Sequence, residues 1–420
     1  MREMKDSGIS WVGEIPKEWS VNRAKYCFVN TKEIAGCRSD RYERLALTMN
    51  GVIKRSKDDS NGLQPEKFET YQILRPDELV FKLIDLQNVS TSRVGLSPYL
   101  GLVSPAYIIL KSNKRVLPAF AEKYFLMLWK NQIFNALGDA GVRSNLNSKD
   151  LLELSIPFPT FDEQKKIADF LDRECGKIDG LKADIQAQID TLEQYKRSVI
   201  TEAVTHGLNP SAPMKDSGIP WVGKIPAKWE VLPIYCVYGE RKRKNVFGAE
   251  QNLLSLSYGK VIRKDINTNG GLLPSNYNGY NIVEKNDIII RPTDLQNDRT
   301  SLRTGLVKEH GIITSAYIAL KPKNRVSSKF YHYLLHSYDV KKVLYNMGNG
   351  VRQGLNYGEF AKLIVYYPPL DEQQEIADYL DNKCGEIEQI IADKKAQIET
   401  LDGYKKSLIY EYVTGKKEIV

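Results

Sequence analysis

The chain has 420 residues, enough for two or three domains with hydrophobic cores of their own, and its 27% of charged residues is ordinary for a globular protein. No apolar run reaches the roughly 18–20 residues that a membrane-spanning helix needs, and the five scattered cysteines do not have the pattern of a disulfide framework. We therefore expect a cytoplasmic protein with no membrane partner. The net charge of +8 favours a polyanion as partner.

The sequence repeats itself about halfway along the chain. MKDSGISWVGEIPKEW at residues 4–19 returns as MKDSGIPWVGKIPAKW at residues 214–229, and SPAYIILK at 104–111 returns as TSAYIALK at 314–321. Cys27 and Cys236 are also copies of one another, as are Cys175 and Cys384, because the offset is 209 or 210 residues throughout. So long a period predicts two homologous halves and not a solenoid.

Each half begins with the Trp-Gly-Pro stretch and continues into a mixed segment with the alternation and composition of an α+β module. The expected strands are Arg44–Thr48, Glu78–Leu83 and Ala106–Leu110, with copies at Leu253–Leu256, Asp287–Ile290 and Ala316–Leu320. A helix is expected in each module, at Ala119–Leu137 and at Lys329–Met347.

A long helix follows each module, where Gly and Pro nearly vanish. Asp162 and Asp371 are expected as N-caps, and each helix should run for about 40 residues, or roughly 60 Å. The apolar stripes are Ile178, Leu181, Ile185, Leu192, Tyr195 and Val199, then Ile387, Ile390, Ile398, Leu401, Tyr404 and Leu408. Narrow stripes of this kind favour an antiparallel coiled coil between the two helices. The alternatives are that each helix packs on its own module or binds other chains.

Charge is segregated along the chain. Residues 21–161 carry 20 Lys and Arg against 14 Asp and Glu, and residues 230–370 carry 20 against 11, whereas the remaining segments are net negative. Two basic modules on acidic supports indicate polyanion binding at two places. Chance surface charge is the alternative interpretation.

The order of these segments resembles the DNA-specificity subunit of Type I restriction-modification enzymes. The resemblance covers nearly the whole chain, and it is most specific in PTFDEQKKIADFLD and PPLDEQQEIADYLD, in the two GVR…LN stretches and in the two Trp-Gly-Pro leaders. It implies two target-recognition domains that each read one half of a split double-stranded DNA sequence. It also implies that the helices set the spacer and dock two methyltransferase subunits, and that restriction subunits join in the full complex.

The expected architecture is therefore two tandem-duplicated α+β target-recognition domains separated by two long helices, with pseudo-two-fold symmetry. The expected domains are 1–161 (recognition domain 1, with the leader at 1–20), 162–206 (helix), 207–370 (linker, second leader and recognition domain 2), 371–415 (helix) and 416–420 (tail).

The sequence itself favours a subunit without catalysis. It has no GxxxxGK[ST] phosphate loop and no FxGxG-like loop for S-adenosylmethionine, so no cofactor is expected. The stretch YYPPL at 366–370 lacks the Asn or Asp and the aromatic residue of an amino-methyltransferase motif. No metal is expected, because His206, His310, His332 and His336 form no ligand pattern.

The first candidate DNA contacts lie in the GVR…LN stretches at 141–147 and 350–356, where glycine precedes one Arg and several amides. The candidates are Arg143, Asn145, Arg352 and Gln353. Pairing of each Arg with a local carboxylate is the alternative. For Asn147 and Asn356, capping of a following helix is the favoured interpretation.

A second group lies in DLQNVSTSR and DLQNDRTSLR, where amides could pair with adenine edges. The amide candidates are Gln87, Asn88, Gln296 and Asn297, although a shared structural turn explains the tetrapeptide at least as well. Arg93, Arg299 and Arg303 are expected as phosphate contacts. A third group is Lys54, Arg55, Arg263 and Lys264, in basic loops that can also be plain solvated charge. Base specificity should reside where the halves differ, as in residues 57–75 against 266–284.

Two other classes of function compete with this interpretation. One is a self-contained DNA methyltransferase or nuclease, which the missing cofactor loop opposes. The other is a coiled-coil adaptor that never touches DNA, which the charge segregation opposes. Under every one of these interpretations, packing anchors are a better explanation than base-stacking platforms for the four leader tryptophans, Trp11, Trp19, Trp221 and Trp229.

Overall fold

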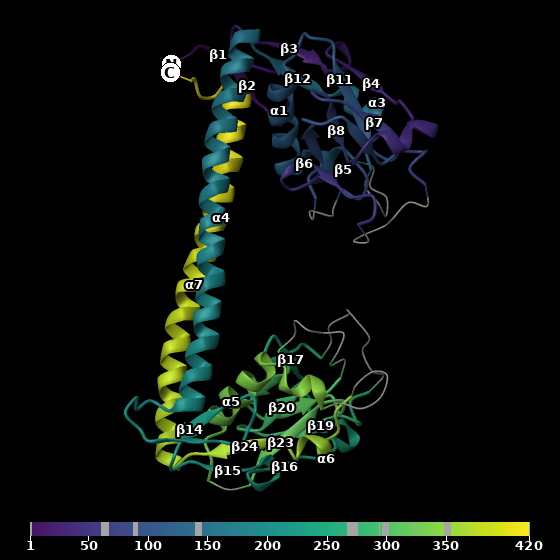
Figure 1. The fold of residues 1–420 in the computed structure, drawn as a ribbon. Coiled ribbons are helices and arrows are strands. Elements are labelled where there is room, and N and C mark those ends of the chain that lie inside the picture. Colours follow the sequence, from purple (N-terminus) through teal and green to yellow (C-terminus); the bar gives the residue numbers. More distant parts are fainter. Residues whose placement is uncertain are drawn as a thin grey trace. The chain divides into compact units, whose positions relative to one another are not determined.

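The computed structural model describes residues 2–59, 67–86, 91–138, 145–266, 276–293, 295, 302–323, 325–347 and 354–419. The chain forms two compact units. Unit 1 is Met1–Ile185 with Lys395–Val420, and unit 2 is Gln186–Lys394. Each unit therefore combines one module with parts of both long helices, and the α+β class predicted from the sequence is confirmed (Figure 1).

The elements of the first half follow in chain order. They are β1 (Met4–Asp6), β2 (Glu14–Pro16), β3 (Ser20–Arg23), η1 (Ala24–Tyr26), β4 (Phe28–Thr31), η2 (Gly36–Arg41), β5 (Arg44–Thr48), β6 (Gly51–Arg55), β7 (Gln72–Leu74), β8 (Leu79–Phe81), β9 (Val94–Leu96), β10 (Gly101–Val103), β11 (Ile108–Ser112), α1 (Pro118–Lys130), α2 (Ile133–Leu137), α3 (Ser148–Glu153), β12 (Ser155–Phe158) and α4 (Phe161–His206).

The second half repeats this order. Its elements are β13 (Met214–Asp216), β14 (Lys224–Pro226), β15 (Glu230–Pro233), η3 (Ile234–Cys236), β16 (Tyr238–Glu240), η4 (Val246–Gly248), β17 (Leu254–Ser257), β18 (Lys260–Arg263), β19 (Asn281–Val283), β20 (Ile288–Ile290), β21 (Thr304–Leu306), β22 (Gly311–Ile313), β23 (Ile318–Pro322), α5 (Ser328–Val340), η5 (Val343–Asn346), α6 (Tyr357–Phe360), β24 (Ile364–Tyr367) and α7 (Leu370–Val413).

The two modules share one sheet topology. The antiparallel sheet β4-β11-β8-β9 of unit 1 returns as β16-β23-β20-β21 in unit 2, strand for strand. A second sheet, β6-β5-β10-β7, corresponds to β17-β18 and β19-β22, which are linked by a bridge between Leu253 and Ile312. All six predicted strands fall on observed ones, within two residues at each end. The duplication seen in the sequence is thus a duplication of fold.

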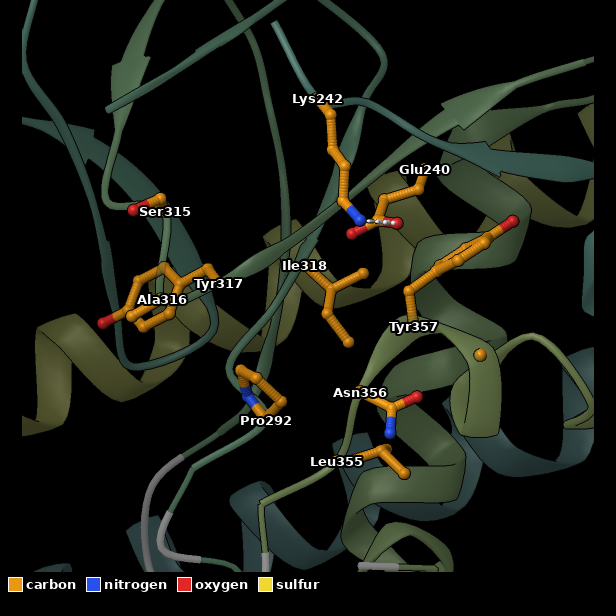
Figure 2. Close-up of a pocket in the computed structure, with 11 residues that line it drawn as sticks. Glu240, Lys242, Pro292, Ser315, Ala316, Tyr317, Ile318, Leu355, Asn356 and Tyr357 are labelled. Carbon is orange, nitrogen blue, oxygen red and sulfur yellow. Dashed lines mark ion pairs between the residues drawn. The ribbon is translucent and has the colours of Figure 1, made fainter. Parts of the chain in front are cut away.

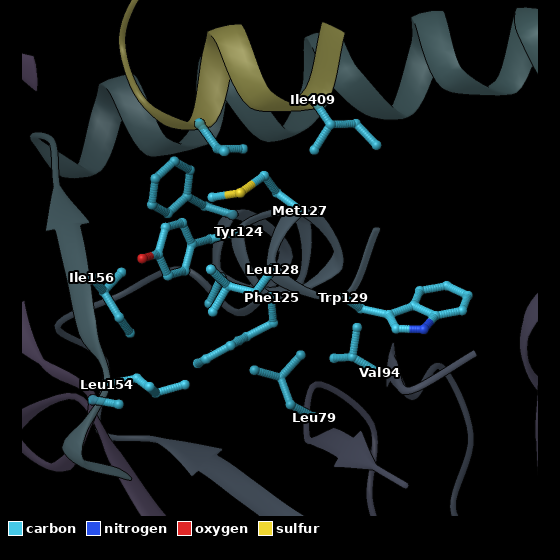
Figure 3. Packing of buried hydrophobic residues seen from close by; sticks show 14 of the residues in the cluster. Leu79, Val94, Tyr124, Phe125, Met127, Leu128, Trp129, Leu154, Ile156 and Ile409 are labelled. Carbon is cyan, nitrogen blue, oxygen red and sulfur yellow. The ribbon is translucent and has the colours of Figure 1, made fainter. Parts of the chain in front are cut away.

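The core of unit 1 forms where α1 packs on the sheet at β9 (Figure 3). Tyr124, Phe125 and Leu128 of α1 are fully buried against Leu79 and Ile156. Burying such large side chains stabilises a fold by about 1.5–3 kcal/mol each. Ile409 of α7 joins this cluster, so the long helix is part of the core of unit 1.

A buried tryptophan holds the leader of each half against the start of a long helix. The indole nitrogen of Trp19 donates to Oε2 of Glu163 at 2.9 Å, and that of Trp229 donates to Oε2 of Glu372 at 3.0 Å. Both side chains are at most 1% exposed. The predicted anchoring role is therefore confirmed for these two residues.

The Gln of each DEQ motif fastens the start of the long helix to the module. Gln164 accepts the backbone N–H of Leu117 at 2.8 Å and donates to the carbonyl of Pro159. Gln373 repeats both bonds with Ser327 and Pro368. These side chains are fully buried, where an unpaired amide would be costly, so this motif has a structural task.

Within each unit the long helices run antiparallel. In unit 1, Lys182 pairs with Asp402 at 2.5 Å and Asp179 with Lys405 at 2.6 Å, so residue numbers rise along α4 as they fall along α7 (Figure 1). In unit 2, Lys196 pairs with Glu388 at 2.9 Å. Each helix also packs on its own module near its start, through Ile167 and Leu171 of α4 and through Ile376 and Leu380 of α7, so the predicted helix pair and the alternative of packing on the module are both present within the units.

Several local predictions need correction. The long helices begin at Phe161 and Leu370, so Asp162 and Asp371 lie in the first turn instead of capping it, where their charge still favours the helix dipole. The predicted single helices of the modules break at Gln132 and Lys342, which both adopt left-handed φ near 60°. Four residues of the predicted stripes are 45–57% exposed, and those are Leu181, Tyr195, Ile390 and Tyr404.

Candidate nucleic-acid interface

The structure brings two of the predicted DNA-contact segments together. In unit 1, the side-chain oxygen of Asn145 accepts the backbone N–H of Asp85 at 3.0 Å, and Leu146 N–H donates to the carbonyl of Leu83. In unit 2, Leu355 N–H donates to the carbonyl of Pro292 at 3.0 Å. The end of the GVR…LN segment therefore lies beside the start of the DLQN segment in unit 1, and beside the residues just before the DLQN segment in unit 2.

Short helices start directly after this junction, and both have capping boxes. The side chain of Asn147 accepts the N–H groups of Lys149 and Asp150, and Asp150 accepts the N–H of Asn147. Asn356 and Glu359 repeat this arrangement in unit 2. The predicted capping role of both asparagines is confirmed, and their side chains are accordingly committed to the backbone.

Arg93 and Arg303 contradict their predicted role as phosphate contacts, because neither side chain is exposed. Arg93 donates to the carbonyl of Asp85, and Arg303 donates to the carbonyls of Arg291 and Thr293. Burial lowers the pKa of the Arg93 guanidinium. These arginines bind the start of the DLQN segment from inside the module, which favours the structural-turn interpretation of that tetrapeptide.

Eight of the predicted contacts lie outside the described residues and remain predictions. They are Gln87, Asn88, Arg143, Gln296, Asn297, Arg299, Arg352 and Gln353.

Lys54 and Arg55, the unit 1 members of the third predicted group, line a basic cavity of about 430 Å³ between η2 and the end of β6. Its lining includes two carboxylates and five cations, namely Asp40, Glu43, Arg41, Arg44, Lys54, Arg55 and Lys57. Lys54 is half exposed and pairs with Glu43 at 2.6 Å, which raises the pKa of the lysine. The excess of positive charge suits phosphate oxygens. Sequence reasoning singled out Lys54 and Arg55, in a basic loop that also holds Lys57, but it missed Arg41 and Arg44, which only the fold brings near.

The equivalent basic positions in unit 2 are Arg263 and Lys264 at the end of β18. Both are exposed, and Arg263 pairs with Glu309, which raises the pKa of the arginine and lowers that of the glutamate. An exposed pair of this kind contributes little to stability, so phosphate can compete for the arginine.

A second cavity, of about 440 Å³, opens in unit 2 beside the junction of the two segments (Figure 2). Pro292 and Leu355 line one part of it, and Tyr317 and Tyr357 flank it from opposite sides. Lys242 and Glu240 form an ion pair of 2.9 Å at its edge. Aromatic faces beside backbone polar groups suit contacts to bases and sugars.

The histidines are held in two different environments. Burial lowers the pKa of His332 to about 3 and that of His336 to about 4, so both are neutral at pH 7. His310 lies 2.8 Å from both Glu250 and Glu284, and its pKa is raised. Within the described ranges, no three His, Cys, Asp or Glu side chains are grouped as metal ligands. No helix there is long and apolar enough to span a bilayer.

Two α+β modules of the same topology, each built onto parts of two long helices, define a class of duplicated two-module proteins. The model of the Type I restriction modification DNA specificity domain matches residues 57–191 and 240–400, which is more than half of the chain. The chain belongs to this family.

Curated relatives and a solved structure agree with this assignment. The chain is 23% identical over 439 residues to a putative type I restriction enzyme specificity subunit, MjaX, of Methanocaldococcus jannaschii, covering 96% of this chain and 95% of the relative. It is also 23% identical over 343 residues to the StySPI specificity subunit of Salmonella potsdam, covering 76% and 72%. A chain from a study of complex assembly and conformational transition of the type I R-M system has the same fold. Its TM-score is 0.69 at 12% identity, over 96% of this chain and 99% of that one.

Proposed function

We propose that the chain is the non-catalytic subunit that selects the DNA target of a Type I restriction-modification complex. Each module reads one part of a bipartite double-stranded site, with recognition domains at residues 1–161 and 207–370. The helices at 162–206 and 371–415 hold the two domains at a set spacing as an antiparallel, pseudo-two-fold coiled coil. They also dock two methyltransferase subunits, to which restriction subunits add in the full complex.

The observation that carries this proposal is the repeated junction of two loop segments. Asn145 and Leu146 meet the segment after β8 in unit 1, and Leu355 meets the segment after β20 in unit 2. Because the family model also matches both halves, each module supplies one such junction for DNA. The remaining candidates, including Arg143, Arg352 and Gln353, are proposed as contacts to bases and phosphates.

The role of the helices as a spacer is supported by their continuity. α4 runs without a break from unit 1 into unit 2, and α7 runs from unit 2 back into unit 1. A helix is a stiff element with a fixed rise of about 1.5 Å per residue, so its length can fix the distance between two half-sites.

Methylome sequencing of cells that carry this chain and its methyltransferase partner tests the proposal. We expect methylation at a two-part motif with a constant unread spacer. Replacing residues 21–161 by the corresponding module of another family member should change one half of the motif and leave the other half intact. A continuous motif, or a swap that alters both halves, would contradict the proposal.

A second experiment separates the adaptor alternative from DNA recognition. The purified complex should bind its methylome-defined site with an affinity that falls steeply with salt, because several lysines and arginines release counterions. Binding that is absent or insensitive to salt would favour the adaptor. Methyl transfer by the chain alone would instead favour the catalytic alternative.

A further inference from the structure

One large apolar side chain of unit 2 is almost fully exposed to solvent. Phe247 in η4 is 91% exposed, more than any other large apolar side chain in the described part of the chain. Its neighbour Val246 is 57% exposed. An exposed aromatic ring contributes nothing to the core of its own module, and its apolar surface would be buried only in a complex.

The backbone at Phe247 is also in an unfavourable conformation. Its φ is 62° and its ψ is 16°, in the left-handed region that bulky residues rarely adopt. Gly248, which adopts this region without cost, follows directly with φ 63°. Phe247 thus has a backbone conformation in which a glycine, such as its neighbour, would be unstrained. The presence of phenylalanine there indicates that the ring is needed and that the strain is tolerated.

The loop that carries Phe247 is fixed at its base by a buried asparagine. Asn245 is fully buried, and its side chain both donates to the carbonyl of Glu250 and accepts the N–H of Glu250, at 2.9 Å each. Its backbone N–H donates to the carbonyl of Tyr280. The ring is therefore presented by an ordered turn, so little conformational entropy would be lost on binding.

The segment before Phe247 is basic, and although Lys242 pairs with Glu240 and Arg243 with Glu284, exposed pairs of this kind are weak enough for phosphate to compete, which favours DNA over an apolar protein surface. Lys242, Arg243 and Lys244 immediately precede the turn, and all three are exposed. A β-carbon added to Gly248 would lie 3.4 Å from the side-chain oxygen of Asn278, so the turn borders residues 266–284, where base specificity is expected. Cations beside an apolar ring are the arrangement with which proteins contact phosphates and insert a wedge between bases.

We propose that Phe247 is a wedge that inserts between two adjacent base pairs of the half-site read by unit 2. This inference rests on the proposed DNA-binding function and adds how unit 2 distorts its half-site. The corresponding turn of unit 1 has no aromatic ring at this position: the backbone bond of Ala35 to Tyr71 matches that of Asn245 to Tyr280, so Cys37 stands where unit 2 has Phe247. Partial unstacking should therefore occur in one half-site alone.

The test uses the full chain with its methyltransferase subunits and duplexes that carry the methylome-defined site. 2-Aminopurine is placed at successive positions of both half-sites, and its fluorescence reports unstacking. Wild-type protein should raise fluorescence at one step of the unit 2 half-site, and Phe247→Ala should abolish that signal and weaken binding about 5- to 100-fold, as expected for the loss of one aromatic–base contact. Phe247→Trp should keep both the fluorescence signal and the affinity for the site. Neither variant should change the salt dependence of DNA binding, because neither removes a charge.

Two further variants keep the outcome decisive. Phe247→Gly relieves the left-handed strain, so it should not lower the urea midpoint but should bind DNA as weakly as Phe247→Ala. Tyr258→Ala removes another exposed aromatic residue of unit 2, 86% exposed with φ 45°, and should leave the fluorescence step in place.

The results distinguish failure of this inference from failure of the proposed function. If wild-type protein binds the site and Phe247→Ala binds it equally with the same fluorescence pattern, the wedge is wrong while DNA recognition stands. If wild-type protein does not bind the site at all, the proposed function is wrong, and the wedge is wrong with it.

Discussion

The two units share a frame and differ at the surface. In both, a buried tryptophan bonds a glutamate of the first helical turn, and a buried glutamine fastens the module beside it. At the surface, by contrast, one ion pair is reversed. Glu33 accepts from Arg75 at 2.6 Å in unit 1, and at the matching backbone positions of unit 2 Arg243 pairs with Glu284 at 3.4 Å.

This contrast separates two kinds of constraint. A buried hydrogen-bonded side chain has few replacements that keep both packing and bonding, so the frame stays the same in both copies. An exposed ion pair contributes little to stability in either orientation, so its charges can change with the ligand. Surfaces that differ between the units are therefore where different half-sites should be distinguished.

The largest expected effect tests the shared frame. Trp19→Ala and Trp229→Ala should each lower the free energy of unfolding by about 3–5 kcal/mol, because each leaves a large cavity and removes the indole hydrogen bond to a glutamate, which keeps only its pair with Arg2 or Lys228. Urea unfolding followed by circular dichroism measures both. Tyr26→Ala, at a 55% exposed position, is the control and should change little. A loss below about 1 kcal/mol for either tryptophan variant would show that the two frames are not equivalent.

The next effect tests the buried arginines. Arg303→Met keeps the length of the side chain but removes its bonds to the carbonyls of Arg291 and Thr293, which should cost about 1–3 kcal/mol of stability. Its effect on the salt dependence of DNA binding should be nil. Lys54→Met, at the exposed basic cavity of unit 1, is the counterpart. It should be nearly neutral for stability and should reduce the slope of log affinity against log salt by about 0.9. If Arg303→Met reduced this slope, the result would support the phosphate contact that was predicted for Arg303 from the sequence.

The sequence predicted the frame well because the duplication displays it. Two copies of each segment, at a constant offset, revealed the modules, the six strands and the capping asparagines. Arg93 and Arg303 were misassigned because a sequence gives an arginine its charge but not its depth, and here the fold encloses both guanidinium groups.

Other features depend on contacts that no sequence pattern encodes. Arg41 and Lys57 line one cavity only because η2 returns beside the end of β6. Gln132 and Lys342 interrupt the predicted helices although both are good helix formers, because both adopt a left-handed backbone conformation that a right-handed helix cannot contain. Phe247 could have been noticed as an aromatic residue within a basic run, but its exposure required the structure.

A smaller effect distinguishes the units by pH. His310 bonds Glu284, which raises the pKa of the imidazole and lowers that of the glutamate, whereas unit 1 has Leu100 at this place. A raised histidine pKa gives stability that is complete below the unfolded value of 6.5 and lost as pH rises through the folded value. The glutamate contributes stability above its unfolded value of 4.5, and this is lost as pH falls through its lowered pKa.

Thermal unfolding measured from pH 5 to 9 should therefore show a decline of under about 1 kcal/mol above pH 6.5, which His310→Gln removes. Tyr235→Phe, at an exposed position away from this cluster, should keep the wild-type profile. A decline that survives in His310→Gln would assign the pH dependence to another group.

The smallest effect concerns the reversed ion pair itself. Glu33→Arg alone brings three cations together at Arg38 and Arg75, and it should lower the free energy of unfolding only slightly, because all three side chains are exposed and screened by solvent. Adding Arg75→Glu reproduces the polarity of unit 2 and should recover most of that loss, because the pair is exposed and can form in either orientation. A double-mutant cycle by urea unfolding measures the recovery. If the destabilisations caused by Glu33→Arg and by Arg75→Glu simply add in the double variant, packing within each module fixes which position carries the acid and which the base. The surface of unit 1 could then not have diverged from that of unit 2 by exchange of this pair alone.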